Sequence, residues 1–199
     1  YPPLRIKGKK LTKRKVSIQG NISSQYISAL LLVASSLENG LEIELLGEIT
    51  SVPYIKMTLT LLDQLGISQS WIGNIIKIEP IKSIDNKVVT VESDWSSASY
   101  FYSLIAISEN GKVILSSYKK DSLQGDSSLI DIYKHFGVRT EFIGDTIHLS
   151  KQNIDVKPLT LDLRNSPDLA QTIVVTCFAL GIACDITGLH TLKIKETDR

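Results

Sequence analysis

The sequence Trp71-Ile72-Gly73-Asn74 recurs further along the chain as Phe142-Ile143-Gly144-Asp145, at an offset of 71 residues. Two more matches keep this offset: Glu38-Asn39-Gly40 with Glu109-Asn110-Gly111, and Gly66 with Gly137. Matches at one constant spacing indicate an internal repeat, and the repeated unit is then the building block of the fold.

Each copy is predicted to fold as a βαβαββ unit. In the first copy, Gly73-Asn74 separates two short apolar runs and is typical of a tight hairpin turn. The stretch from Ser23 to Leu37 is apolar nearly all round, which predicts a buried helix. A second helix is expected to start at Ser51 and Pro53 and to end at Gly66. The strands of this copy are expected at 15–19, 41–46, 71–72 and 75–78.

The later copies repeat the pattern. The second copy is expected to contain strands at 88–91 and 112–116, helices at 97–107 and 127–136, and a hairpin turning at 144–145. The third is expected to contain a strand at 159–163, a helix at 167–180 and a strand at 182–186, and the sequence then stops half-way through the unit. The predicted fold class is therefore α/β (mixed α+β), with two complete units and part of a third.

Composition excludes several classes of protein. The chain has 199 residues, 43% of them hydrophobic and 22% charged, which is typical of a folded globular protein. The longest uncharged stretch is too short for a membrane span. Because the sequence begins with Tyr1 and ends within a repeat, we expect it to be a central piece of a longer chain. The polar segment 79–87, which contains a proline, is the expected linker between units.

The charge is unevenly distributed although its formal sum is only +1. No acidic residue precedes Glu38, whereas seven basic residues lie between Arg5 and Lys15. Such a run could bind nucleic acid or another polyanion, but no aromatic side chain is interleaved there to stack on bases. A solvated strand or loop is the simpler interpretation.

Metal and nucleotide chemistry lack support in the sequence. Cys177 and Cys184 fit no metal or redox spacing, and both lie in an apolar segment where buried thiols are expected. The three histidines are scattered, and no glycine-rich nucleotide motif or serine-hydrolase motif occurs. We therefore expect neither a metal nor a cofactor.

Three predicted helix starts carry groups suited to binding anions or moving protons. Ser23-Ser24-Gln25 opens one helix, where free N–H groups, the helix dipole and two hydroxyls favour an anion. Ser51 and Tyr54 open the next helix, and Asp168 follows Pro167 at a third. Helix capping and packing explain these residues equally well. The cluster Lys195-Glu196-Thr197-Asp198-Arg199 is likewise typical of a solvated helix start.

Two of these motifs resemble those of a known family. Leu192 to Arg199 resembles the Lys-Glu-Ser/Thr-Asp-Arg signature of the 3-phosphoshikimate 1-carboxyvinyltransferase (EPSP synthase) family, and Gly20 to Gln25 resembles its Ser-Ser-Gln motif. The resemblance runs in order over the whole chain, through Tyr1–Leu4, Val52–Ile55, Ser97–Phe101 and Leu123–Asp126. It implies the enolpyruvyl-transferase fold, an inside-out α/β barrel of six βαβαββ units in two domains. Residues 1–84 would then supply one unit of the first domain, and 85–199 one complete and one partial unit of the second.

The resemblance also implies an activity. The enzyme would transfer the enolpyruvyl group of phosphoenolpyruvate to the 5-hydroxyl of shikimate 3-phosphate, releasing phosphate, in aromatic amino-acid biosynthesis. It would be cytoplasmic and monomeric at full length, with no nucleic-acid or membrane partner. Because other binding residues of the family lie outside residues 1–199, the chain alone is expected to be inactive.

Site residues are carried over from the same resemblance. Asp168 is implied as the proton acceptor, and Glu196 as a participant in proton transfer at the methylene carbon. Substrate binding is implied for Ser23, Ser24, Gln25, Ser51, Tyr54, Lys195 and Arg199. Thr191 departs from the pattern, because many members carry there an Asn that contacts shikimate 3-phosphate.

Two alternatives remain open. UDP-N-acetylglucosamine enolpyruvyl transferase shares the repeat fold and reaction type, although its site does not combine the two motifs found here. A non-enzymatic polyanion-binding module would rest on the basic run from Arg5 to Lys15.

Overall fold

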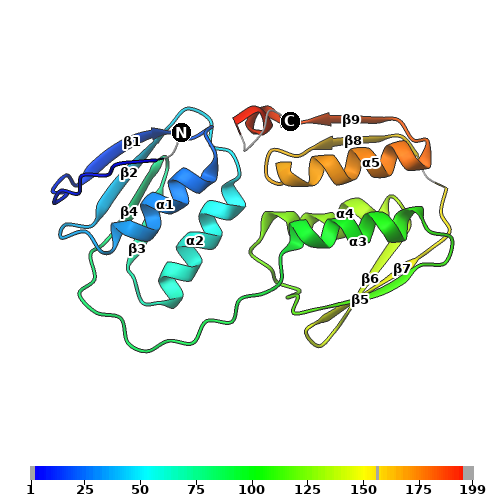
Figure 1. Ribbon diagram of the computed structural model, residues 1–199, viewed down its shortest axis with the longest axis horizontal. Coiled ribbons are helices and arrows are strands. Elements are labelled where there is room, and N and C mark those ends of the chain that lie inside the picture. Colours follow the sequence, from blue (N-terminus) through cyan, green and yellow to red (C-terminus); the bar gives the residue numbers. More distant parts are fainter. Residues whose placement is uncertain (1–2, 156, 195–199) are drawn as a thin grey trace.

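The computed structural model describes residues 3–155 and 157–194, which form two lobes side by side (Figure 1). The first lobe spans residues 15–78 and the second spans residues 95–194. Each lobe has its own buried hydrophobic core, one formed within residues 27–78 and the other within 95–192. Residues 79–94 connect the lobes without a helix or strand.

The first lobe confirms the expected βαβαββ order. Its sheet has the strand order β1-β2-β4-β3, in which β1 and β2 are parallel and the other neighbours are antiparallel. Gly73 closes the β3–β4 hairpin with a positive φ of 60°. The elements are β1 (Lys15–Gln19), α1 (Ser24–Ala34), β2 (Leu41–Leu46), α2 (Val52–Gln64), β3 (Gln69–Ile72) and β4 (Ile75–Ile78).

Helices α1 and α2 cover one face of this sheet and pack against each other. Ile27 and Leu31 of α1 are fully buried, and Ser28 Oγ lies 2.9 Å from Thr58 Oγ1 of α2. The expectation that α1 is buried all round is wrong, because Leu32 and Val33 are exposed. An apolar run does not show how many sides of a helix find a partner.

The described part of the second lobe contains two small sheets, three α-helices and three 3₁₀ turns. Its three-stranded sheet is antiparallel with the order β5-β7-β6, and β8 pairs in parallel with β9. The core between them is rich in aromatic rings, including Trp95, which meets Tyr118 edge to face at 4.9 Å between ring centroids. The elements are α3 (Trp95–Ile107), β5 (Lys112–Ser116), η1 (Gly125–Ser128), α4 (Leu129–Lys134), β6 (Val138–Ile143), β7 (Thr146–Lys151), β8 (Leu159–Asp162), η2 (Pro167–Leu169), α5 (Ala170–Leu180), β9 (Cys184–Thr187) and η3 (His190–Ile194).

One predicted strand is absent from the described residues. The structure places no strand at 88–91, where Val88 is 98% exposed. Ser93 lies at the end of β5: its Oγ donates to the carbonyl of Ser116 at 3.0 Å and its N–H to the carbonyl of Ser117 at 2.7 Å. A segment with alternating residues forms a strand only where it can pair with a neighbouring strand. Here the segment is exposed to solvent instead.

The expected helices at 127–136 and 167–180 each begin as a short 3₁₀ turn, η1 and η2, before the α-helix starts. Helix α3 begins two residues earlier than expected, because Asp94 caps it by accepting from the N–H groups of Ser96 and Ser97. Of the two cysteines, Cys177 is buried as expected, whereas Cys184 is exposed at the start of β9.

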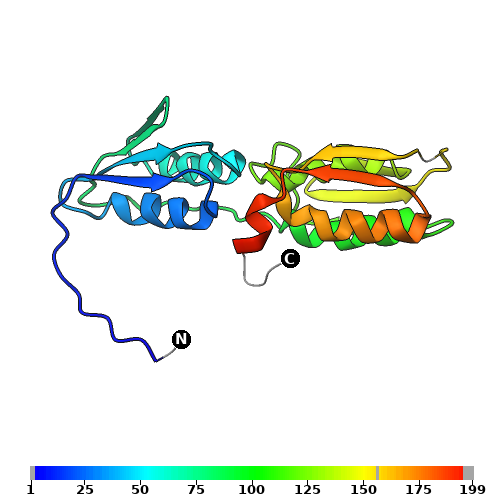
Figure 2. The same ribbon diagram turned by 90° about the horizontal axis from the view of Figure 1, so that it is seen from above.

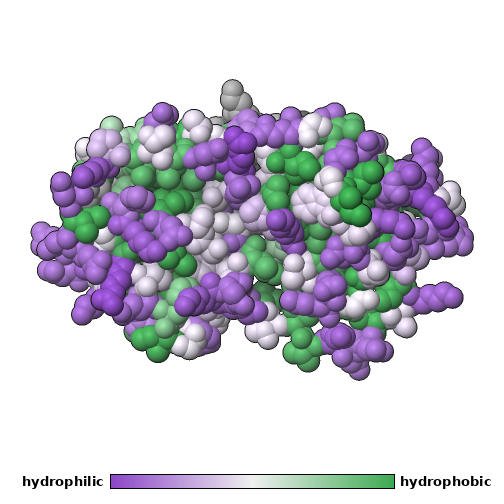
Figure 3. Space-filling view, turned by 180° about the vertical axis from the view of Figure 1, so that it is seen from behind, coloured by the Kyte–Doolittle hydropathy of each residue, from purple (hydrophilic) through white to green (hydrophobic). Residues whose placement is uncertain are grey.

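The surface carries apolar side chains on both lobes, interspersed with polar groups (Figure 3). Within the described residues, no helix is long and apolar enough to cross a membrane. The division of the chain at residues 84 and 85 into parts of two larger domains stays a prediction.

Candidate active site

The candidate site begins at one edge of the first lobe's sheet. Because β1 and β2 are parallel, the loops that follow them lie together, and the N–H of Thr50 donates to the carbonyl of Gly20 at 3.1 Å. Helices α1 and α2 start directly after these loops. The sheet therefore brings two helix N-termini to the same edge, where ligands commonly bind in α/β proteins.

Ser23, Ser24 and Gln25 form the start of α1. Ser23 is buried and caps the helix, since its Oγ accepts from the N–H of Gln25 at 3.4 Å. Ser24 is half-buried and Gln25 is exposed. The first turn contains no acidic residue, so the positive end of the helix dipole is not offset within the turn.

Ser51 precedes α2 in an unusual backbone conformation. Its φ of 53° and ψ of 36° lie in the left-handed region, and its side chain makes no capping hydrogen bond. Capping by this side chain, one of the two interpretations of Ser51 from the sequence, is therefore not observed, although Ser51 occupies the cap position. A left-handed serine costs free energy, and such strain is often retained at functional sites.

The second lobe faces this edge through the 3₁₀ turns η1 and η2. The N–H of Ser51 donates to the carbonyl of Arg164 at 3.2 Å, and the Arg164 guanidinium pairs with Glu48 at 2.8 Å. Residue 125 of η1 packs against the first turn of α2 so closely that a Cβ there would lie 3.1 Å from Pro53 and 3.2 Å from the Tyr54 ring. These contacts bring the start of α2 against η1 and the loop before η2.

Tyr54, Asp126 and Asp168 form a titratable cluster at this junction. Burial, then the charge and hydrogen bonding of Asp126, raise the pKa of the Tyr54 phenol far above its usual value, with a further contribution from Asp168. Burial likewise raises the pKa of the Asp126 carboxyl, although hydrogen bonds from Ser96 and Tyr54 partly oppose it. Asp168 is half-buried in η2, and its charge also raises the pKa of both groups. The cluster therefore combines two acids with a protonated phenol.

The structure thus brings Tyr54 and Asp168 together and places Ser23 and Ser51 at neighbouring helix starts. Lys195, Glu196 and Arg199 lie outside the described residues. Asp126 was not singled out from the sequence, because an acidic residue before an apolar helix is typical of a cap. It is completely buried where η1 meets α2 and α3, both distant from it in sequence.

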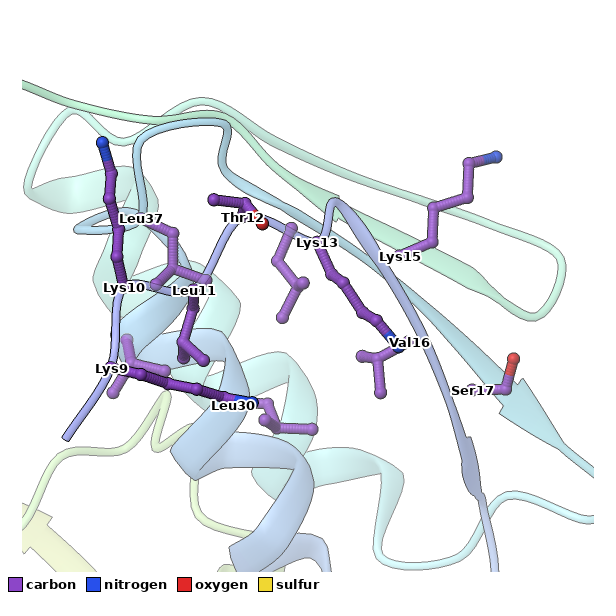
Figure 4. Close-up of a pocket in the computed structure, with 12 residues that line it drawn as sticks. Lys9, Lys10, Leu11, Thr12, Lys13, Lys15, Val16, Ser17, Leu30 and Leu37 are labelled. Carbon is purple, nitrogen blue, oxygen red and sulfur yellow. The ribbon is translucent and has the colours of Figure 1, made fainter. Parts of the chain in front are cut away.

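The basic run forms a second feature, separate from this cluster. Residues 3–14 contain no helix or strand and extend away from the first lobe (Figure 2). Residues 9–13 of this segment border a cavity of about 570 Å³ against α1, in which the ends of Lys9 and Lys13 lie near Leu30 and Val16 (Figure 4). Lys10 and Lys15 pair with Glu38 and Glu42, which offsets part of the positive charge. Among the described residues, no group of three or more His, Cys, Asp or Glu is placed to hold a metal ion.

Comparison with known proteins identifies the family. The profile of EPSP synthase (3-phosphoshikimate 1-carboxyvinyltransferase) matches residues 1–199. The chain belongs to the EPSP synthase family. Its relatives include the 3-phosphoshikimate 1-carboxyvinyltransferases of Bacteroides fragilis, 46% identical over 200 residues, and Colwellia psychrerythraea, 39% identical over 211 residues.

Both alignments include the whole of this EPSP synthase family member. They include only 48% and 46% of the two relatives, so the chain spans about half their length. The solved structure of EPSP synthase from Acinetobacter baumannii matches 93% of the chain, and the chain covers 43% of that protein. The TM-score is 0.63 at 18% sequence identity, which supports the predicted fold.

Proposed function

We propose that this chain supplies the shikimate 3-phosphate side of an EPSP synthase active site. The enzyme would transfer the enolpyruvyl group of phosphoenolpyruvate to the 5-hydroxyl of shikimate 3-phosphate, giving 5-enolpyruvylshikimate 3-phosphate and phosphate. The observation that carries this proposal is the pair of helix starts, at Ser23 and Ser51, beside the Tyr54–Asp126–Asp168 cluster. Family membership supports it.

The helix starts would bind the phosphate of the substrate. The hydroxyls of Ser23, Ser24 and Ser51 are proposed to donate hydrogen bonds to it, together with backbone N–H groups of the first turn of α1. Because α1 carries no acid in that turn, its dipole favours the anion. The Tyr54 ring is proposed to pack on the substrate ring, and Gln25 to contact both substrates.

Proton transfer would fall to acids of the second lobe. Addition joins the 5-hydroxyl oxygen to C2 of phosphoenolpyruvate while C3 gains a proton; elimination then expels phosphate and removes a proton from that carbon. Asp168 is proposed to accept the hydroxyl proton, because a carboxylate within reach of the nucleophile can act as a general base. Glu196 is proposed to act at C3, with Lys195 on shikimate 3-phosphate and Arg199 on phosphoenolpyruvate.

Other parts of the proposal concern the whole enzyme. A cytoplasmic location, a monomeric state and the absence of a cofactor are expected for it. We further propose that residues 1–199 alone do not turn over substrate, because family residues outside this range contribute to binding.

Calorimetric titration of the chain with shikimate 3-phosphate tests the half-site, with shikimate as the unphosphorylated control ligand. We expect binding that requires the phosphate and weakens in Ser24→Ala, whereas Ser70→Ala, which alters an exposed residue of β3, leaves it unchanged. Absence of binding would contradict the half-site.

The same titration separates the alternatives. Preferential binding of UDP-N-acetylglucosamine would favour the sister enolpyruvyl transferase. Binding that falls steeply with salt and shows no preference for shikimate 3-phosphate would favour a polyanion module.

A further inference from the structure

Asp126 is a buried carboxylate with an incomplete set of hydrogen bonds. Its residue is 0% exposed, and its Oδ2 accepts from Ser96 Oγ at 2.5 Å. Its Oδ1 is buried without a hydrogen-bond partner of normal geometry in the described residues. A buried carboxylate in this state is unfavourable, because it has lost water without a full replacement.

This carboxylate interacts with the phenol of Tyr54, which belongs to the other lobe. After burial, the charge and side-chain hydrogen bonding of Asp126 are the causes that raise the pKa of the Tyr54 phenol. Burial and the acid together favour the protonated phenol, which can donate to the carboxylate. The neighbouring Gly125 lies close to Cε2 of the same ring. Residue 125 therefore lies beside the Tyr54 ring, and the adjacent Asp126 interacts with the phenol of that ring.

The arrangement costs stability. Asp168 and Asp94 add like charge near Asp126, and Ser96 and Tyr54 offset only part of the burial cost. An amide or an apolar side chain of similar volume would avoid this penalty. Buried charged groups without a full set of hydrogen bonds are expected mainly where function requires them.

We propose that Asp126 is a positioning residue, which fixes the orientation of the Tyr54 ring by accepting a hydrogen bond from its hydroxyl across the junction of the two lobes. The inference rests on the proposed function, in which that ring packs against shikimate 3-phosphate. Asp126 itself does not touch the substrate. It acts by fixing the Tyr54 side chain in its binding orientation before the substrate arrives, which reduces the conformational entropy lost on binding.

Two substitutions separate hydrogen bonding from volume. Asp126→Asn keeps an acceptor oxygen, whereas Asp126→Leu fills the space without one. Tyr54→Phe removes the donor. Ser96→Ala is the matched control, because it removes the other hydrogen bond to Asp126 and leaves Tyr54 untouched.

The first measurement needs no ligand. NMR of the 199-residue chain with ¹³C-labelled tyrosine reports the ring-flip rate of Tyr54, whose signals are the ones missing from Tyr54→Phe. We expect slow flipping in the wild type, Asp126→Asn and Ser96→Ala, and at least tenfold faster flipping in Asp126→Leu. An unchanged rate in Asp126→Leu would overturn the positioning role, and equal acceleration in Asp126→Asn would show that hydrogen-bond acceptance is not its basis.

The second measurement connects positioning to binding. Calorimetry with shikimate 3-phosphate is expected to show about tenfold weaker binding in Asp126→Leu and in Tyr54→Phe, and no further loss in the double variant. Penalties that add would contradict an action through Tyr54. If the wild type does not bind at all, the proposed half-site fails, while the ring-flip result still decides whether Asp126 positions Tyr54.

Discussion

The backbone N–H of Ser51 donates a hydrogen bond to the carbonyl of Arg164, 3.2 Å away, and so joins the start of α2 to the loop before η2. Ser51 makes this bond while its backbone is left-handed. The residue with the strained backbone is therefore also one that joins the two lobes. The same residue is a proposed phosphate ligand, which links that contact to binding.

Replacing Ser51 with Gly should relieve the strain and remove the hydroxyl. Because glycine adopts a left-handed φ without a Cβ penalty, we expect Ser51→Gly to be more stable by about 0.5–1 kcal/mol, as measured by urea unfolding. Affinity for shikimate 3-phosphate should fall, because a donor to the phosphate is lost.

Ser117 offers the matched control for this change. It is the other non-glycine residue with a positive φ in the described part of the chain, at 65°, and it follows β5. Ser117→Gly should give a similar gain in stability and leave affinity unchanged. A loss of affinity in both variants would show that backbone relaxation, and not the Ser51 hydroxyl, weakens binding.

Gly125 is expected to tolerate no side chain. A Cβ at this position would lie 2.6 Å from the carbonyl oxygen of Asn165, and that oxygen belongs to the backbone. We expect Gly125→Ala to destabilise the chain by about 1–3 kcal/mol, the usual cost of overpacking. Thermal unfolding measures the effect, and Gly8→Ala is the control because no atom lies within 4 Å of its added Cβ. Equal melting temperatures for Gly125→Ala and the wild type would contradict the tight contact.

The fold could be predicted closely where local chemistry determines it. The bounds of β1, β2 and β4 agree with their sequence patterns, since a Gly-Asn turn and alternating residues set the hairpin and its faces. The segment 88–91 has a similar pattern and forms no strand. Strand formation there depends on a neighbour, which no local pattern encodes.

The candidate site was predicted from resemblance more than from spacing. Ser23 and Asp168 occupy helix starts, where capping alone explains their residue types. Asp126 could not be found in this way, because it is buried where η1 meets both α3 and α2, which are distant in sequence. Likewise, nothing in the residues around Ser51 indicates its left-handed backbone. That conformation occurs together with the hydrogen bond from Ser51 to Arg164, a residue of the other lobe.

Asp168→Asn tests the proposed proton acceptor. The amide cannot take a proton from the 5-hydroxyl, so in a chain as long as the family's relatives we expect kcat to fall by about 10²–10⁴-fold. Affinity for shikimate 3-phosphate should be retained or slightly improved, because a negative charge near an anionic substrate is removed. Phosphate release and calorimetry measure the two effects. Asp185→Asn, at an exposed position on β9, is the control, and near-normal turnover in Asp168→Asn would refute the role.

The stability of the chain should depend on pH through Asp126. Burial is the main cause that raises its pKa above the ordinary 3.8, and Asp168 and Asp94 add to it, while Ser96 and Tyr54 oppose it. The folded state therefore binds this proton more tightly than the unfolded state. Its contribution to stability is complete below pH 3.8 and is lost as the pH rises through the folded-state pKa.

Asp126→Asn removes this titration while keeping the shape of the side chain. We expect the free energy of unfolding of the variant, relative to that of the wild type, to increase as the pH is raised from about 3.5 towards about 7, the range in which a buried carboxyl titrates. Urea unfolding at a series of pH values measures the difference, and Asp185→Asn, at an exposed position, is the control. A constant offset between Asp126→Asn and the wild type would mean that the two states bind the Asp126 proton equally, so that burial of this carboxyl costs the fold nothing.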